Sequence, residues 1–176
     1  MKVGRFGTVV VAAVMIVVPA AASFAAESAG DAKAAFERLK KLNGDWQGHV
    51  GTADGPEVNV TYRVTGAGSV VMETLDPGKP HEMVSMYHLD GKELVMTHYC
   101  AGGNQPHLRL NPAASSATEL TFDFTGGSNL NPAVDSHMHS GKLLLKDDGH
   151  IESAWTGYDK GKPSGEKRFF LTRKKP

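Results

Sequence analysis

From Trp46 onward, hydrophobic and polar residues alternate along the chain with a period of two. The stretch VNVTYRV, residues 58–64, places valines and Tyr62 on one face and polar side chains on the other. This alternation is typical of a β-strand that buries one face. Further stretches of the same kind follow, separated by turns rich in glycine, proline, asparagine and aspartate. The pattern predicts about nine or ten short strands in succession.

One segment ahead of these strands has the period of a helix. Residues 31–42 begin with Asp31, a residue type that caps helix N-termini, and Asn43–Gly44 supplies a stop. The apolar stripe along this segment consists of Phe36, Leu39 and Leu42. The sequence therefore predicts a short helix that covers part of a β-structure without building a core of its own.

No helical pattern long enough to connect parallel strands lies between the predicted strands, so neighbouring strands are expected to pair antiparallel. A sheet of this length must protect its edges, and closure into a barrel removes them. We therefore expect an all-β fold, an antiparallel up-and-down β-barrel of about 8–10 strands with a short N-terminal helix.

The first residues of the chain differ from the rest in composition. A short basic segment precedes an uncharged apolar run, residues 8–18, and Ser23 and Ala25 fit the small positions of a cleavage site. The apolar run is too short to span the ~30 Å hydrocarbon core of a bilayer. We expect a signal peptide at residues 1–25, cleaved near Ala25, and one mature domain, residues 26–176, in the periplasm or outside the cell.

Charge and cysteine content narrow the possible partners. The chain has 19 basic and 19 acidic residues, so its formal net charge is zero. This balance gives no electrostatic reason to bind nucleic acid. No cysteine follows the cleavage region, so we expect no lipid anchor there. The single cysteine cannot form an intramolecular disulfide. The basic run Arg173–Lys175 is expected to be a solvated tail.

Strand phase places several metal-ligand residue types on apolar faces. His98 and Cys100 share a face with Met96, and His137 and His139 share a face with two leucines of their own strand. If these faces line the barrel, four donor groups point into its lumen, where each needs a partner. Two interpretations remain open. The residues line a polar pocket, or they hold a transition metal such as zinc.

Catalysis has weaker support in the residue pattern. His98 and Cys100 lie two residues apart on one face, which leaves a cysteine-dependent enzyme as an alternative. Three carboxylates, Glu73, Glu82 and Asp123, are expected at the surface, and no acid/base pair stands out. Enzyme activity is therefore left open, and binding is favoured over it.

The overall arrangement resembles a known group of barrels. A short helix leads into LNGDWQG, with Gly44 and Trp46, consecutive hairpins follow, and FFLTRKK closes the chain. This is similar to the calycin group, with its lipocalin-like and nitrobindin-like barrels, in which a Gly-x-Trp on the first strand packs across the barrel floor. The stretches HEMVSMYHLDG and HMHS also resemble those of exported bacterial proteins. Nitrobindins bind haem through a histidine close to the C-terminal strand; SGEKRFFLTRKK has none, so haem ligation does not carry over.

Together these patterns predict an exported barrel that binds a small hydrophobic or amphipathic molecule in its lumen. The alternatives are a metal- or haem-associated barrel and a Cys/His-dependent enzyme. The oligomeric state stays open. The side chains expected to contact the ligand are Tyr62, Met96, His98, Cys100, Phe122, His137, His139 and Trp155. The candidate metal ligands among them are His98, Cys100, His137 and His139.

Overall fold

The computed structural model describes Met1 and residues 31–175. The signal peptide predicted for residues 1–25, with its cleavage site near Ala25, lies outside the described residues. In the part of the chain that is described, no helix is both long enough and apolar enough to cross a membrane.

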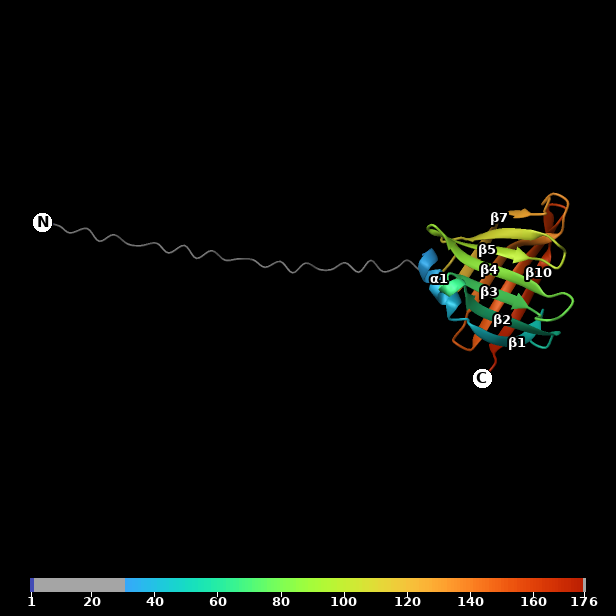
Figure 1. Cartoon of the computed structure of the whole chain (residues 1–176), viewed down its shortest axis with the longest axis horizontal. Helices are drawn as coiled ribbons and strands as arrows, with labels where there is room; N and C mark the ends of the chain where they lie inside the picture. Colours follow the sequence, from blue (N-terminus) through green and yellow to red (C-terminus); the bar gives the residue numbers. More distant parts are fainter. Residues whose placement is uncertain (2–30, 176) are drawn as a thin grey trace.

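Ten antiparallel strands form a closed barrel, which confirms the predicted fold class (Figure 1). Each strand pairs with its neighbours in sequence, and β1 pairs with β10 to close the barrel. The helix and strands are α1 (Ala32–Lys40), β1 (Gly44–Val50), β2 (Glu57–Thr65), β3 (Val70–Leu75), β4 (Met83–Asp90), β5 (Glu93–Tyr99), β6 (Gln105–Leu110), β7 (Glu119–Ser128), β8 (His137–Leu145), β9 (His150–Asp159) and β10 (Lys162–Arg173). A single 3₁₀ turn, η1 (Gly66–Gly68), joins β2 to β3.

The alternation seen in the sequence sets which side chains enter the barrel. In β2, Val58, Val60 and Tyr62 are buried, and the residues between them are partly exposed. In β5, Met96 and His98 are buried in the same way. Strand phase therefore predicted the inward face of both strands correctly.

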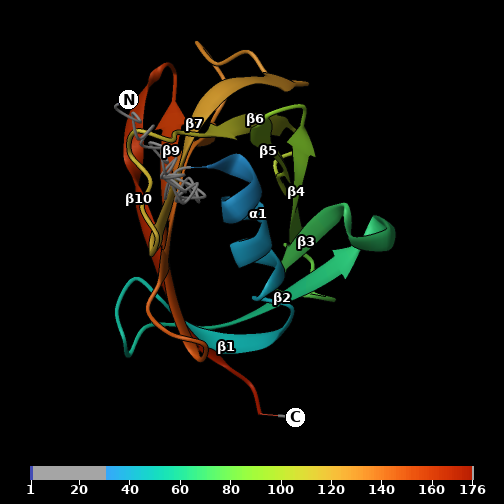
Figure 2. The ribbon, with the colours of Figure 1, turned by 90° about the vertical axis from the view of Figure 1, so that its left-hand side faces the viewer.

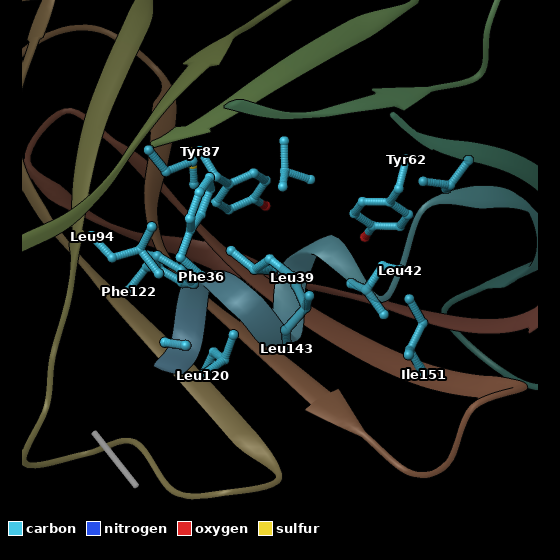
Figure 3. Packing of buried hydrophobic residues seen from close by; sticks show 14 of the residues in the cluster. Phe36, Leu39, Leu42, Tyr62, Tyr87, Leu94, Leu120, Phe122, Leu143 and Ile151 are labelled. Atoms are coloured by element: carbon cyan, nitrogen blue, oxygen red, sulfur yellow. The ribbon is translucent and has the colours of Figure 1, made fainter. Parts of the chain in front are cut away.

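The helix α1 lies inside one end of the ring of strands (Figure 2). Its first turn is capped by Asp31, whose carboxylate accepts a 2.9 Å hydrogen bond from the Ala34 N–H. Phe36 and Leu39 are buried among aromatic and aliphatic side chains of the strands (Figure 3). The strand residues labelled around them are Tyr87, Leu94, Leu120, Phe122, Leu143 and Ile151. The helix thus fills this end of the barrel with apolar packing.

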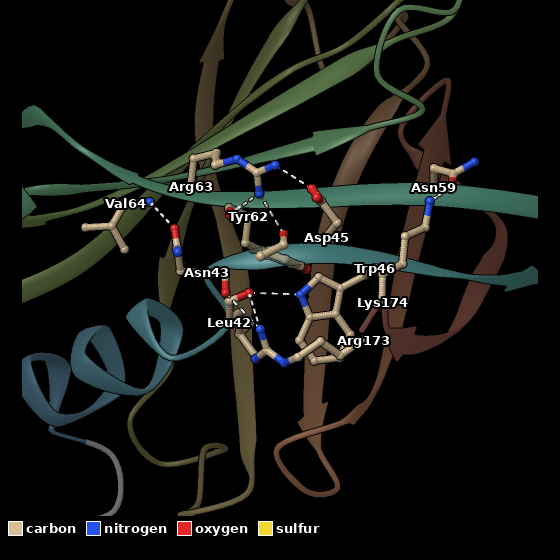
Figure 4. Close-up of polar contacts among 11 residues, drawn as sticks. Leu42, Asn43, Asp45, Trp46, Asn59, Tyr62, Arg63, Val64, Arg173 and Lys174 are labelled. Atoms are coloured by element: carbon tan, nitrogen blue, oxygen red, sulfur yellow. Dashed lines mark hydrogen bonds and ion pairs between the residues drawn. The ribbon is translucent and has the colours of Figure 1, made fainter. Parts of the chain in front are cut away.

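Trp46 is fully buried at the junction of α1 and β1, as the Gly-x-Trp pattern predicted. Its indole N–H donates a 2.8 Å hydrogen bond to the carbonyl of Leu42. The guanidinium of Arg173 lies over the indole ring, 4.3 Å from its centroid, and donates to the carbonyls of Lys41 and Asn43 (Figure 4). The expectation of a solvated tail is therefore wrong for Arg173, which is the last residue of β10 and holds the end of the helix.

Candidate functional site

A cavity of about 420 Å³ opens at the end of the barrel opposite α1. Its lining includes Met83, which begins β4, Cys100, which follows β5, and His137, which begins β8. In an antiparallel barrel these strand ends face away from the end that the helix fills. The main apolar lining residues are Val60, Leu75, Met83, Met138, Trp155 and Phe169. The helix and the cavity therefore divide the interior between them.

A row of polar side chains crosses four adjacent strands between the helix and the cavity. Tyr62 of β2 pairs with Glu73 of β3, Glu73 pairs with Ser85 of β4, and Ser85 pairs with His98 of β5. All four residues are buried. Glu73, Ser85 and His98 also line the cavity. Because they stand at matched register positions, the barrel itself brings them side by side.

Glu73 is the acidic member of this row. Its two carboxylate oxygens accept hydrogen bonds from the hydroxyls of Tyr62, at 2.9 Å, and Tyr87, at 2.7 Å. Burial raises the pKa of Glu73, and the hydrogen bonds from Tyr87, Tyr62 and Ser85 act in the opposite direction. Burial also raises the pKa of both tyrosines well above its usual value, so they remain hydrogen-bond donors at neutral pH.

His98 is the basic member of the row. Its Nδ1 lies 3.0 Å from the hydroxyl oxygen of Ser85. Burial lowers the pKa of His98 to about 4, because the charged imidazolium loses its hydration. At neutral pH the ring is therefore uncharged, and it adds a hydrogen-bonding group to the cavity without adding a positive charge.

The two histidines of β8 are separated by a β-bulge. Register shifts between Met138 and Ser140, which leaves His139 as the extra residue. His137 is buried and lines the cavity. His139 stacks between Tyr158 and Phe124, with ring centroids 3.7 Å and 4.7 Å away. The two imidazoles lie side by side and share these aromatic neighbours, but only His137 belongs to the cavity lining.

The nitrogens of His137 are already engaged. Nδ1 lies 2.9 Å from the carbonyl oxygen of Asp135, and Nε2 lies 3.1 Å from Nδ1 of His139. A carbonyl only accepts, so Nδ1 of His137 carries the proton and Nε2 of the neutral ring accepts from His139. In this arrangement His139 occupies the second ring nitrogen of His137.

The four candidate metal ligands are not assembled into one site. His98, Cys100 and His137 surround the same cavity, whereas His139 stands outside its lining. Across residues 31–175, no three histidine, cysteine, aspartate or glutamate side chains are grouped to hold a metal ion. The geometry thus favours the pocket interpretation of these residues over the zinc site.

The remaining predicted ligand contacts divide into two groups. Trp155 lines the cavity, and its ring lies over Gly141, where a Cβ atom would be only 1.8 Å from the ring. Tyr62, Met96 and Phe122 are fully buried and belong to the core, outside the cavity lining. Tyr62 does contact a residue of the cavity lining, because its hydroxyl donates a hydrogen bond to Glu73.

Cys100 is half-buried at the cavity wall. The N–H of Gly102 donates to its sulfur at 3.4 Å. Among the described residues, no hydrogen bond joins this sulfur to His98, whose Nδ1 is directed at Ser85. The Cys/His pair that nucleophilic catalysis needs is therefore not formed.

Glu73 is the site residue that sequence reasoning missed, because a lone carboxylate was expected at the surface. It is 8% exposed and lines the cavity. A signal was present in SVVMETL, where Glu73 has the same strand phase as Val71 and Leu75. Strand phase outweighs residue type here because two tyrosines satisfy the carboxylate.

No model of a known protein family matches the chain, and no curated protein matches its sequence.

Proposed function

We propose that this protein binds a small amphipathic molecule in the cavity of its barrel. The observation that carries the proposal is a cavity of about 420 Å³, open at one end, with apolar walls and a few buried polar groups at its inner end. Cavities of this size and character are typical of small-molecule sites. The apolar walls suit a hydrocarbon or aromatic body, and Glu73, Ser85 and His98 suit one polar group.

Two further parts of the proposal concern the origin of the chain and its location. The closed barrel is compatible with a calycin-like ancestry, which the Gly44–Trp46 pattern supports. The signal-peptide pattern of residues 1–25 supports export to the periplasm or beyond. An exported barrel with an open cavity would carry, sequester or sense a molecule outside the cytoplasm.

Binding of the uncharged fluorescent dye Nile red tests the proposal. The dye should gain fluorescence with the purified protein because it enters an apolar, water-poor space. Met83→Trp places an indole in the cavity mouth and should weaken binding by at least about tenfold by filling the volume that the dye needs.

Leu89→Trp is the matched control for this experiment. Leu89 lies on the same strand, β4, but 37% of it is exposed and it is not part of the cavity lining. This variant should bind the dye as the wild type does. Equal loss in both variants, or no binding to the wild type, would contradict a ligand-binding cavity.

A further inference from the structure

The inner end of the cavity carries a buried acid without a cationic partner. Within residues 31–175, no lysine, arginine or histidine forms an ion pair with Glu73. The basic side chain in its row is His98, which is uncharged at neutral pH. A buried carboxylate is costly unless a positive charge or several donors offset its lost hydration. A ligand that brings a positive charge would therefore be stabilised here.

The carboxylate also has room for one more hydrogen bond. An ionised carboxylate has about four acceptor sites on its two oxygens. Tyr62 and Tyr87 each use one, and the neighbouring Ser85 hydroxyl accounts for at most a third. At least one acceptor site is left on a residue that lines the cavity. A hydrogen-bond donor of the ligand could occupy this free acceptor site on the Glu73 carboxylate.

The walls above Glu73 suit the rest of such a ligand. Trp155, Tyr158 and Phe169 line the cavity and present aromatic surface. Aromatic faces attract cations and also pack against apolar groups. Two further charged residues, Glu166 and Lys167, line the cavity and are neighbours on β10. They are exposed and opposite in sign, so together they add little net electrostatic potential inside the cavity.

We propose that the cavity selects an organic amine, bound as its ammonium against Glu73 with its apolar body along Trp155 and Phe169. This inference rests on the proposed function and adds the chemical class of the ligand. The hydroxyls of Tyr62 and Tyr87 hold the carboxylate in place, which spares the ligand the cost of ordering it.

Three probes that share one apolar body test the inference. Phenylbutylamine, phenylbutanol and phenylbutyric acid are titrated against the wild type by calorimetry near neutral pH. The amine should bind at least about tenfold more tightly than the alcohol because a charge-assisted hydrogen bond is about twice as strong as a neutral one. The acid should bind more weakly than the alcohol. Equal affinity of amine and alcohol, or preference for the acid, would overturn the inference.

Glu73→Gln removes the charge and keeps the size of the side chain. It should abolish the preference for the amine over the alcohol, because the negative charge that attracts the ammonium is gone. Glu152→Gln is the matched control, because Glu152 lies outside the cavity lining and pairs with Lys146. It should keep the preference. Loss of the preference in both variants would contradict the role of Glu73.

Proton release from the wild type keeps the inference testable if Glu73→Gln does not fold. An ammonium beside Glu73 stabilises the carboxylate, so amine binding should release protons at mildly acidic pH, whereas alcohol binding should not. Buffers of different ionisation enthalpy measure this release. The other titratable groups around the cavity are His98, Cys100, His137, Tyr158, Glu166 and Lys167. Equal release by the amine and the alcohol would contradict the inference.

The outcomes separate this inference from the proposed function. If the alcohol and Nile red bind and the amine has no advantage, the cavity binds small molecules but does not select amines. If neither Nile red nor any of the three probes binds, the proposed function itself is wrong.

Discussion

At the scale of single residues, burial in the barrel shifts the pKa of side chains that ordinarily ionise. The hydrogen-bonding neighbours of each side chain add to or oppose that shift. Glu73 accepts hydrogen bonds from Tyr62 and Tyr87, and these, together with the neighbouring Ser85 hydroxyl, oppose the rise in its pKa caused by burial. His98 has one hydrogen bond, to Ser85, and burial lowers its pKa to about 4. The acid and the base of one polar row are thus both shifted toward their uncharged forms.

This shift predicts how stability depends on pH. The unfolded chain binds a proton at His98 near its ordinary pKa of 6.5, whereas the folded protein binds it only near 4. Since the unfolded state holds more protons between these values, stability falls as the pH drops through this window, by about 3 kcal/mol in total. Glu73, with its raised pKa, acts in the opposite direction.

The difference between the wild type and His98→Gln isolates the histidine. Urea unfolding at steps from about pH 8 to about pH 4 should show the wild type losing stability relative to the variant on acidification. A constant difference across this range would mean that His98 is not buried in its neutral form.

At the scale of elements, α1 determines where the cavity can be. The helix is only nine residues long, and a helix of this length is marginal in isolation, so its stability comes from packing inside the barrel. Phe36 and Leu39 take up the space between strands at one end. The opposite end has no such plug among the described residues, and the cavity lies there.

Substitutions on two faces of α1 test this role. Leu39→Ala should lower the free energy of unfolding by about 2–5 kcal/mol, because it leaves a void in a fully packed region. Lys33→Ala, on the exposed face of the same helix, should change it by less than about 0.5 kcal/mol. Urea denaturation of the three proteins measures both. A small loss for Leu39→Ala would mean that the helix does not pack inside the barrel.

At the scale of the whole molecule, Arg173 joins the last strand to the first helix. Its guanidinium donates to the carbonyls of Lys41, Asn43 and Asp148 and lies over Trp46. A cation at a helix C-terminus also interacts favourably with the helix dipole. The contact fixes the region where β10 meets β1 and the barrel closes.

Replacement of this arginine tests its contribution to closure. Arg173→Lys keeps the charge but loses the planar guanidinium, with its several hydrogen bonds and its stacking on Trp46. It should lower the free energy of unfolding by about 1–3 kcal/mol. Lys175→Met, two residues on and exposed, should change it by less than about 0.5 kcal/mol. If the two variants lose the same amount in thermal unfolding, Arg173 is part of a solvated tail after all.

The sequence alone determined the features that depend on local order along the chain. Strand alternation predicted the barrel and the inward direction of Met96 and His98, and Asp31 marked the start of the helix. These features follow from side-chain period and from capping, which act over a few residues.

Only the tertiary structure decided which of these residues meet. The bulge at His139 shifted the register of β8, and strand register set Glu73 between Tyr62 and Ser85. A one-residue change of register or an extra residue in a strand alters the facing side chains without a clear mark in the sequence. The partners of Glu73 come from other strands, so the closed barrel, and not the chain order, makes its burial possible.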